Sequence, residues 1–139
     1  LKNVMVSENV TKIPSFSMSN MGSVENVVLS PDVTTIKEKA FKNCKSLETV
    51  KMSDSVSRMS SSVFAGCTSL KDFTIPDSVC EIDQSAFAGC TSLEKIVIPD
   101  SVTSIGEGAF EGCSGLRYVT LPKVEVIPEN AFKDCIRLS

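Results

Sequence analysis

A cysteine returns at an almost constant interval along most of this chain. Five cysteines are separated by 23, 23, 23 and 22 residues: Cys44, Cys67, Cys90, Cys113 and Cys135. A phenylalanine stands three residues before each of them and a leucine three residues after, so both follow the same period. A fixed period of this length indicates an array of stacked units, in which each unit packs only against its neighbours.

The period divides the 139 residues into six units and the start of a seventh. The predicted units are 1–23, 24–46, 47–69, 70–92, 93–115 and 116–137, and the seventh begins at 138. A unit of this size buries too little apolar surface to offset the entropy of ordering it, so its stability must come from stacking. We therefore expect one array rather than several domains.

Each unit repeats one local pattern, which is clearest in the fifth unit. Alternating β-branched residues predict a short strand over 96–98. Residues 99–101 predict a turn, and 102–105 predict a second short extended piece. Residues 106–113 predict one or two helical turns with the apolar side chains on one side. Each such turn should end in a residue that tolerates a positive φ: Asn20, Asn43, Gly66, Gly89, Gly112 and Asp134.

The units resemble the BspA-like class of leucine-rich repeats, as the stretches LEKIVIPDSVTSIGEGAFEGCSG and LKDFTIPDSVCEIDQSAFAGCTS show. The class motif runs roughly L-x-x-I-x-I-P-x-x-V-x-x-I-G-x-x-A-F-x-x-C, and the match covers the whole chain. The resemblance implies a right-handed repeat solenoid of the leucine-rich-repeat type. A parallel β-sheet would lie on its concave side, with short extended pieces and short helical turns on its convex side. The resemblance also implies a surface or secreted protein of bacteria or protists that takes part in adhesion.

The first and last units depart from the pattern. The first carries Met18 and Met21 in the phenylalanine and cysteine positions, and Phe16 could take the phenylalanine's place if the loop shifted. The last lacks one turn residue between Pro122 and Val124. The array also starts and stops without the polar capping unit that solenoids need at their ends. We therefore expect a piece of a larger protein, and the open ends would permit end-to-end self-association.

The composition excludes several classes of function. No histidine is present, which removes Ser-His and Cys-His nucleophile pairs and histidine-ligated metals. The net charge is −3 without any basic run, which argues against nucleic acid and against an anionic membrane surface. The apolar stretches are far too short to span a membrane. Gly106, Gly108 and Gly112 lack the spacing of a dinucleotide-binding loop, so we expect neither catalysis nor a cofactor.

The repeated cysteine has four interpretations. A structural zinc site needs thiolates that converge on one ion, whereas an even ladder keeps them apart. A disulfide between neighbouring units is sterically conceivable, although five equivalent thiols cannot all pair. A catalytic thiolate needs a nearby base or cation, but phenylalanine, glycine and serine flank this position. Because Met21 fills the same position with a thioether, we favour a small buried packing group.

Cys80 stands outside this series. Other units fill its position with polar residues: Thr11, Thr34, Ser57, Thr103 and Glu125. Cys80 is therefore the candidate exposed thiol of the chain, open to reaction or to an intermolecular disulfide. The alternative is an incidental surface cysteine without a role.

Two charged rows run along the predicted array. Acidic residues follow the strands: Glu8, Asp32, Asp54, Asp77 and Asp100. Single carboxylates in one row do not form the oxygen cage that calcium needs, so we interpret them as turn formers. The residues just before the strands change sign between later units: Lys2, Glu25, Glu48, Lys71, Glu94 and Arg117. These charges are expected to support the register of the strands.

The strand face is where we expect a partner to bind. Exposed residues of this face should alternate with buried ones along each strand. The predicted protein-contact residues come from the fourth, fifth and sixth units: Asp72, Thr74, Lys95, Val97, Tyr118 and Thr120. Tyr118 is the single tyrosine of the chain, and tyrosine is a favoured anchor of protein interfaces. The alternative is an ordinary solvated face, with the partner bound elsewhere in a larger protein.

The residues and the resemblance together favour a non-catalytic protein-binding or adhesion module at the cell surface or outside the cell. Its partner would be a host or extracellular matrix protein, or a protein on the surface of another cell. The alternatives are an architectural spacer and a cytoplasmic scaffold, with which six unpaired thiols are compatible. We expect no nucleic-acid partner and no direct insertion into a membrane.

Overall fold

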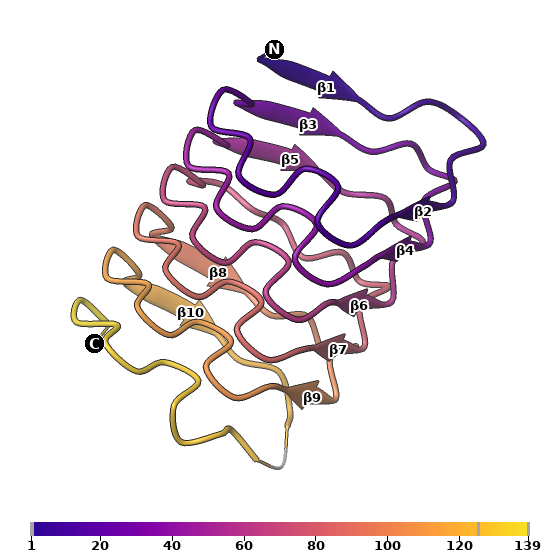
Figure 1. The fold of residues 1–139 in the computed structure, drawn as a ribbon. Coiled ribbons are helices and arrows are strands. Elements are labelled where there is room, and N and C mark those ends of the chain that lie inside the picture. Colours follow the sequence, from indigo (N-terminus) through magenta and orange to yellow (C-terminus); the bar gives the residue numbers. More distant parts are fainter. Residues whose placement is uncertain (1, 125, 139) are drawn as a thin grey trace.

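The computed structural model describes residues 2–124 and 126–138 and shows a solenoid of parallel strands (Figure 1). Each period of the sequence forms one rung. Neighbouring rungs pair residues that are 23 apart, such as Asn3 with Asn26 and Asn26 with Thr49. The two ends of the chain lie at opposite ends of the stack (Figure 1).

Three-residue strands form one side of the solenoid, which we call the strand side. They are β1 (Asn3–Met5), β3 (Asn26–Val28), β5 (Thr49–Lys51), β8 (Lys95–Val97) and β10 (Tyr118–Thr120). Strand β8 confirms the strand predicted at 96–98 to within one residue. Within the described residues these strands form two sheets, β1-β3-β5 and β8-β10. Between them, Asp72 of the fourth rung makes only an isolated bridge with Thr49.

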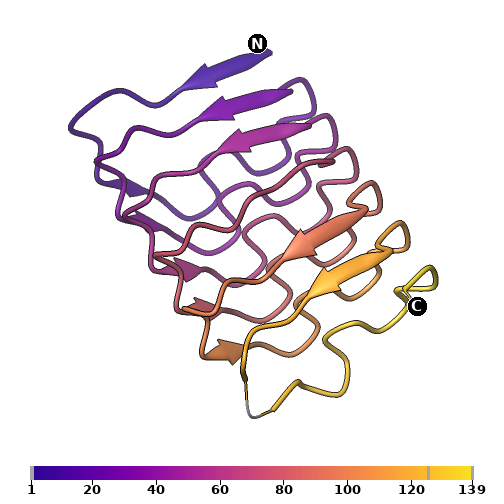
Figure 2. The same cartoon turned by 180° about the vertical axis from the view of Figure 1, so that it is seen from behind.

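Two-residue strands form the second side, and they confirm the second extended piece in the first five units. They are β2 (Lys12–Ile13), β4 (Thr35–Ile36), β6 (Arg58–Met59), β7 (Glu81–Ile82) and β9 (Ser104–Ile105). They pair as β2-β4 and as β6-β7-β9 (Figure 2). The second residue of each strand is apolar and buried, which anchors this side to the core.

The third side, which we call the turn side, contradicts the prediction of helical turns. No helix occurs in residues 2–124 or 126–138. Instead, the N–H groups of Phe87 and Gly89 donate across to the carbonyls of Ala109 and Glu111 in the next rung, both at 2.8 Å. The N–H of Cys90 donates back to Phe87 at 3.2 Å, only three residues earlier. An α-helix directs every N–H to the carbonyl four residues before it, so bonding between rungs excludes that helix.

Left-handed residues interrupt the chain twice in most turns. The predicted set has φ values between 60° and 76°, which confirms the prediction: Asn20, Asn43, Gly66, Gly89, Gly112 and Asp134. A second, unpredicted set lies four residues earlier: Phe16, Lys39, Ser62, Ser85 and Gly108. Two left-handed residues in one turn prevent the chain from continuing as a right-handed helix.

The periodic phenylalanines form a continuous stack through the core. From Phe41 to Phe132, the centroids of adjacent rings lie 5.2–5.7 Å apart and their planes differ by only 3–18°. Offset stacking of this kind is a favourable arrangement of aromatic rings. The cysteines of the series lie beside the stack and are at most 9% exposed. From the second rung onward, the periodic phenylalanine and cysteine therefore form the core beneath the turn side.

The first rung replaces this arrangement in a way that differs from the prediction. Phe16 does not enter the core: it is 56% exposed, and Lys39 Nζ lies 5.4 Å from the centre of its ring. The reason is that Phe16 occupies one of the left-handed positions, with a φ of 60°. Met18 packs against the core in its place, because a flexible thioether can fill the space of a ring.

Candidate protein-contact site

Four of the predicted contact residues stand side by side on the strand side. Strands β8 and β10 pair Tyr118 with Lys95 and Thr120 with Val97. All four side chains are exposed, whereas Ile96 between them is buried in the core. Val97 is 57% exposed and Tyr118 is 67% exposed, which is high for large apolar side chains. These four residues therefore form a compact two-by-two array, which we call the strand-side patch.

The other two predicted residues lie outside this array. Asp72 and Thr74 are exposed, but their segment is irregular and separates β5 from β8. Asp72 shares a surface hollow with Lys95 and Tyr118. Thr74 lines a different hollow, next to β3 and β5. The structure thus joins Asp72 to the strand-side patch and leaves Thr74 apart from it.

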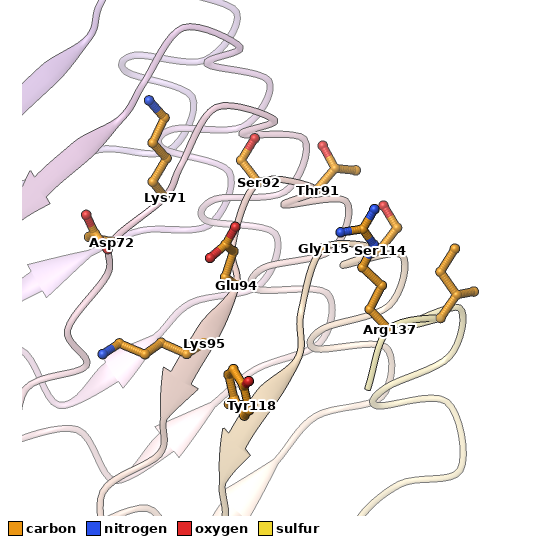
Figure 3. A pocket seen from close by; sticks show the side chains of 11 residues that line it. Lys71, Asp72, Thr91, Ser92, Glu94, Lys95, Ser114, Gly115, Tyr118 and Arg137 are labelled. Atoms are coloured by element: carbon orange, nitrogen blue, oxygen red, sulfur yellow. The ribbon is translucent and has the colours of Figure 1, made fainter. Parts of the chain in front are cut away.

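The hollow beside the patch has a volume of about 770 Å³ and is lined by three consecutive rungs (Figure 3). Its lining carries charges of both signs: Lys71, Asp72, Glu94, Lys95 and Arg137. Tyr118 and Ile136 add apolar surface, and Ile136 is 78% exposed. Charged groups around exposed apolar side chains resemble the rim and centre of a protein interface.

Sequence reasoning missed three charged residues of this hollow, Lys71, Glu94 and Arg137. Lys71 and Glu94 were interpreted as supporting the register, and Lys71 Nζ does lie 3.9 Å from Glu48 Oε2 in the preceding rung. The same side chains line the hollow because the position before each strand stays exposed. Arg137 joins them from the last described turn, where the repeat pattern holds no signal for a contact residue.

The thiols of the periodic cysteines bond to the backbone of the preceding rung. Cys90 Sγ donates to the carbonyl of Phe64 at 3.3 Å, and Cys113 Sγ donates to that of Phe87 at 3.1 Å. Each of the other three periodic cysteines makes the same kind of contact. The cysteine is therefore the buried packing group that we favoured, and it also supplies a hydrogen-bond donor to the core.

Burial keeps these thiols protonated. It raises the pKa of Cys67 and of Cys113 to about 12, because a thiolate would lose its hydration in the apolar core. The charge of a neighbouring thiolate contributes to the increase in both pKa values, whereas a hydrogen bond from the backbone opposes it. At neutral pH such groups are thiols, which are poor nucleophiles.

Cys80 lies on the second side of the solenoid, just before β7, and is exposed. Its Sγ lies 3.7 Å from the carbonyl oxygen of Ser78. Beside it, Arg58 Nη2 lies 2.5 Å from Glu81 Oε2, and Arg58 Nε lies 3.6 Å from Asp83 Oδ2. The bond to Glu81 raises the pKa of Arg58, and burial raises the pKa of Asp83. A reactive role for Cys80 stays a prediction.

The acidic row shows contacts between rungs rather than a cage of ligands. Asp32 Oδ2 accepts a hydrogen bond from the N–H of Asn9 in the preceding rung at 2.8 Å. Among residues 2–124 and 126–138, no three cysteine, aspartate or glutamate side chains gather closely enough to hold a metal ion. In the same part of the chain, we find no helix with the length and apolar character needed to cross a membrane.

The chain is similar to a known repeat family. A family model described as a BspA type leucine rich repeat region matches residues 11–139, with six copies of the repeat. A search of curated proteins finds no match. The family model spans all of the strand-side patch and the hollow beside it.

Three of the similar solved structures come from different bacteria. A leucine-rich repeat protein from Bacteroides ovatus ATCC 8483 matches 99% of this chain at 32% identity and a TM-score of 0.93. A leucine rich cell surface protein from Faecalibacterium prausnitzii A2-165 matches 96% at 32% identity and a TM-score of 0.84. A leucine-rich repeat protein from T. pallidum matches 99% at 25% identity and a TM-score of 0.81. The chain spans 38%, 35% and 78% of these three proteins, respectively.

Proposed function

Since this chain belongs to the BspA-type leucine-rich repeat family, we propose that it is a non-catalytic protein-binding module whose contact surface is the strand-side patch with its adjoining hollow. The observation that carries the proposal is the exposure of Val97 and Tyr118 on paired strands. Most large apolar side chains at the repeated positions of the rungs are buried in the core, although Met5 and Leu121 are also exposed. An apolar pair in solvent, bordered by charged groups, fits a protein partner.

The variation between rungs supports this assignment. Positions that build the core repeat nearly the same residue type in every rung, whereas the first exposed strand position holds five residue types in six rungs: Asn3, Asn26, Thr49, Asp72, Lys95 and Tyr118. A position without a packing role is free to carry recognition. The aromatic member stands at the hollow, where a partner side chain can be desolvated on several sides.

A place at the cell surface or outside the cell is part of the same proposal. One similar structure is described as a leucine rich cell surface protein. We propose a corresponding role in adhesion for the protein that contains this chain, with a host, matrix or other cell-surface protein as the partner. The competing proposals are an architectural spacer and a cytoplasmic scaffold, in which the patch would have no ligand.

Binding of the purified chain to immobilised extracellular matrix proteins tests the function. For any protein that binds, Tyr118→Ala should weaken the affinity about 30-fold, since truncating an aromatic hot spot costs about 2 kcal/mol. Met5→Ala is the matched control, because Met5 is 79% exposed on the same side but lies on β1, four rungs from β8. An unchanged affinity for Tyr118→Ala would contradict the patch. Absence of binding to every matrix protein would favour the spacer.

A further inference from the structure

The strand side is divided at the fourth rung. The N–H groups of Leu29 and Ile98 donate to the next rung at 3.0 Å, where Lys51 and Thr120 accept them. The corresponding N–H of Ile75 makes no such bond. Among residues 2–124 and 126–138, no backbone hydrogen bond joins 71–75 to 94–98. Figures 1 and 2 show this segment as an irregular ribbon between the arrows of β5 and β8.

Contacts to the third rung are weaker than usual as well. The N–H of Lys71 donates to the carbonyl of Glu48 at 3.3 Å, whereas the equivalent bonds of Glu48 and Arg117 measure 2.7 Å. Only the isolated bridge between Thr49 and Asp72 continues the sheet. The segment 71–75 is thus loosely bonded on one side and unbonded on the other.

The residue that distinguishes this rung is Phe73. Other rungs place valine or isoleucine at its position, so only the fourth rung adds a ring there. The ring of Phe73 lies 5.1 Å from both Phe64 and Phe87, tilted by 60° and 67°. Phe64 and Phe87 are 5.7 Å apart, the widest spacing in the stack. The extra ring acts as a wedge between the third and fourth rungs, to which Phe64 and Phe87 belong.

The other two sides remain continuous across the same boundary. On the second side, β7 pairs with β9 through Glu81 with Ser104 and Ile82 with Ile105. On the turn side, three N–H groups donate across at 2.8–3.1 Å, and the thiol of Cys113 reaches Phe87. The fourth and fifth rungs are therefore joined along two sides and open along the third, which is the geometry of a hinge.

We propose that segment 71–75 is a hinge that divides the strand side into two rigid plates, β1-β3-β5 and β8-β10. The plates open and close about the continuous turn side. The hollow of Figure 3 spans the division, because Lys71 and Asp72 lie on the hinge while Lys95 and Tyr118 lie on the second plate. Opening changes the width of this hollow. The hinge goes beyond the proposed function and does not require a partner.

Amide hydrogen exchange followed by NMR on the 139-residue chain tests the hinge. The amides of Lys95 and Ile75 should exchange at least about 10-fold faster than those of their counterparts Tyr118 and Ile98, because local opening exposes them. A uniform array frays from its ends, so it would protect the central rungs best. Equal or slower exchange at Lys95 and Ile75 would therefore overturn the hinge. This measurement needs no variant.

Phe73→Ile tests the wedge, since isoleucine occupies the same position in the next rung at Ile96. Exchange at Lys95 and Ile75 should slow to within about 3-fold of Tyr118 and Ile98 once the ladder closes. Phe132→Leu is the control, because it removes a ring from the far end of the stack. That change should leave exchange at both amides unaltered. Fast exchange that persists in folded Phe73→Ile would exclude Phe73 as the cause.

Discussion

The turn side and the strand side of the same rungs differ in how closely they follow the repeat. On the turn side, each phenylalanine stacks on the next and each cysteine bonds to the preceding rung. On the strand side, the exposed residues change from rung to rung and the sheet is interrupted. The repeated residues therefore stabilise the stack, whereas the variable residues have no packing role and can serve binding or local motion.

The interruption of the strand ladder indicates that the turn side contributes more to the stability of the stack than the strand side does. The fourth rung loses its strand ladder to the fifth, yet Phe87, Cys90 and Leu93 there remain fully buried. The stack survives because its ring contacts and the bonds of the turn side do not depend on the sheet. Perturbing the turn side should therefore have larger effects than perturbing the strand side.

The largest effect is expected for Phe87→Ala. Its ring touches Phe64, Phe73 and Phe110, so truncation should lower the free energy of unfolding by about 3–5 kcal/mol. The matched change on the strand side, Val97→Ala, should stay within about 0.5 kcal/mol because the side chain is exposed. Urea denaturation of both variants measures the contrast. Equal losses would contradict the unequal roles of the two sides.

Alkaline pH is expected to lower the free energy of unfolding by about 3 kcal/mol through the ionisation of one buried thiol. The pKa of Cys67 is about 12 in the folded chain against 9.0 for a free thiol, so the unfolded chain releases its proton first. The stabilisation is complete below pH 9 and is lost between pH 9 and 12. At pH 11 the loss reaches about 3 kcal/mol, at about 1.4 kcal/mol for each pH unit.

Comparing variants separates this loss from the titration of other groups. The free energy of unfolding of Cys67→Ala should rise by the same amount relative to that of the unchanged chain between pH 8 and pH 11, so that the variant becomes the more stable of the two at pH 11. Val63→Ala, a buried change without an ionisable group in the same turn, should cost the same at both values. Chemical denaturation at the two pH values measures both. A cost of Cys67→Ala that does not change with pH would refute the burial argument.

A smaller effect is expected for Cys90→Ala at neutral pH. The carbonyl of Phe64 loses the thiol donor but keeps the N–H of Cys67 at 3.1 Å, so no acceptor is left unbonded. We expect a loss of about 1–2 kcal/mol from the missing contact and the small cavity. Cys80→Ala on the exposed surface should change stability by less than about 0.5 kcal/mol. Similar losses for the two variants would contradict the structural role of the periodic thiols.

Particular residues show how far the sequence alone could predict the site. The alternation around Ile96 predicted the strand and placed Lys95 and Val97 on its exposed face. The hollow could not be predicted, because it depends on how Arg137 and Tyr118 of one rung meet Lys71 from two rungs earlier. The helical turns were predicted wrongly because the second left-handed set ranges from phenylalanine and lysine to serine and glycine: Phe16, Lys39, Ser62, Ser85 and Gly108.

The sequence by itself determined the period, the residues of the core and the left-handed position before each cysteine. These features are local or repeated, so one unit reports on all the others. Only the tertiary structure decided that the turns bond to the neighbouring rung instead of forming helices, and that the strand side is interrupted at the fourth rung. Both depend on competition between contacts within a rung and contacts to the next rung. Which contacts form is decided only when the rungs stack, so the sequence of a single unit does not reveal it.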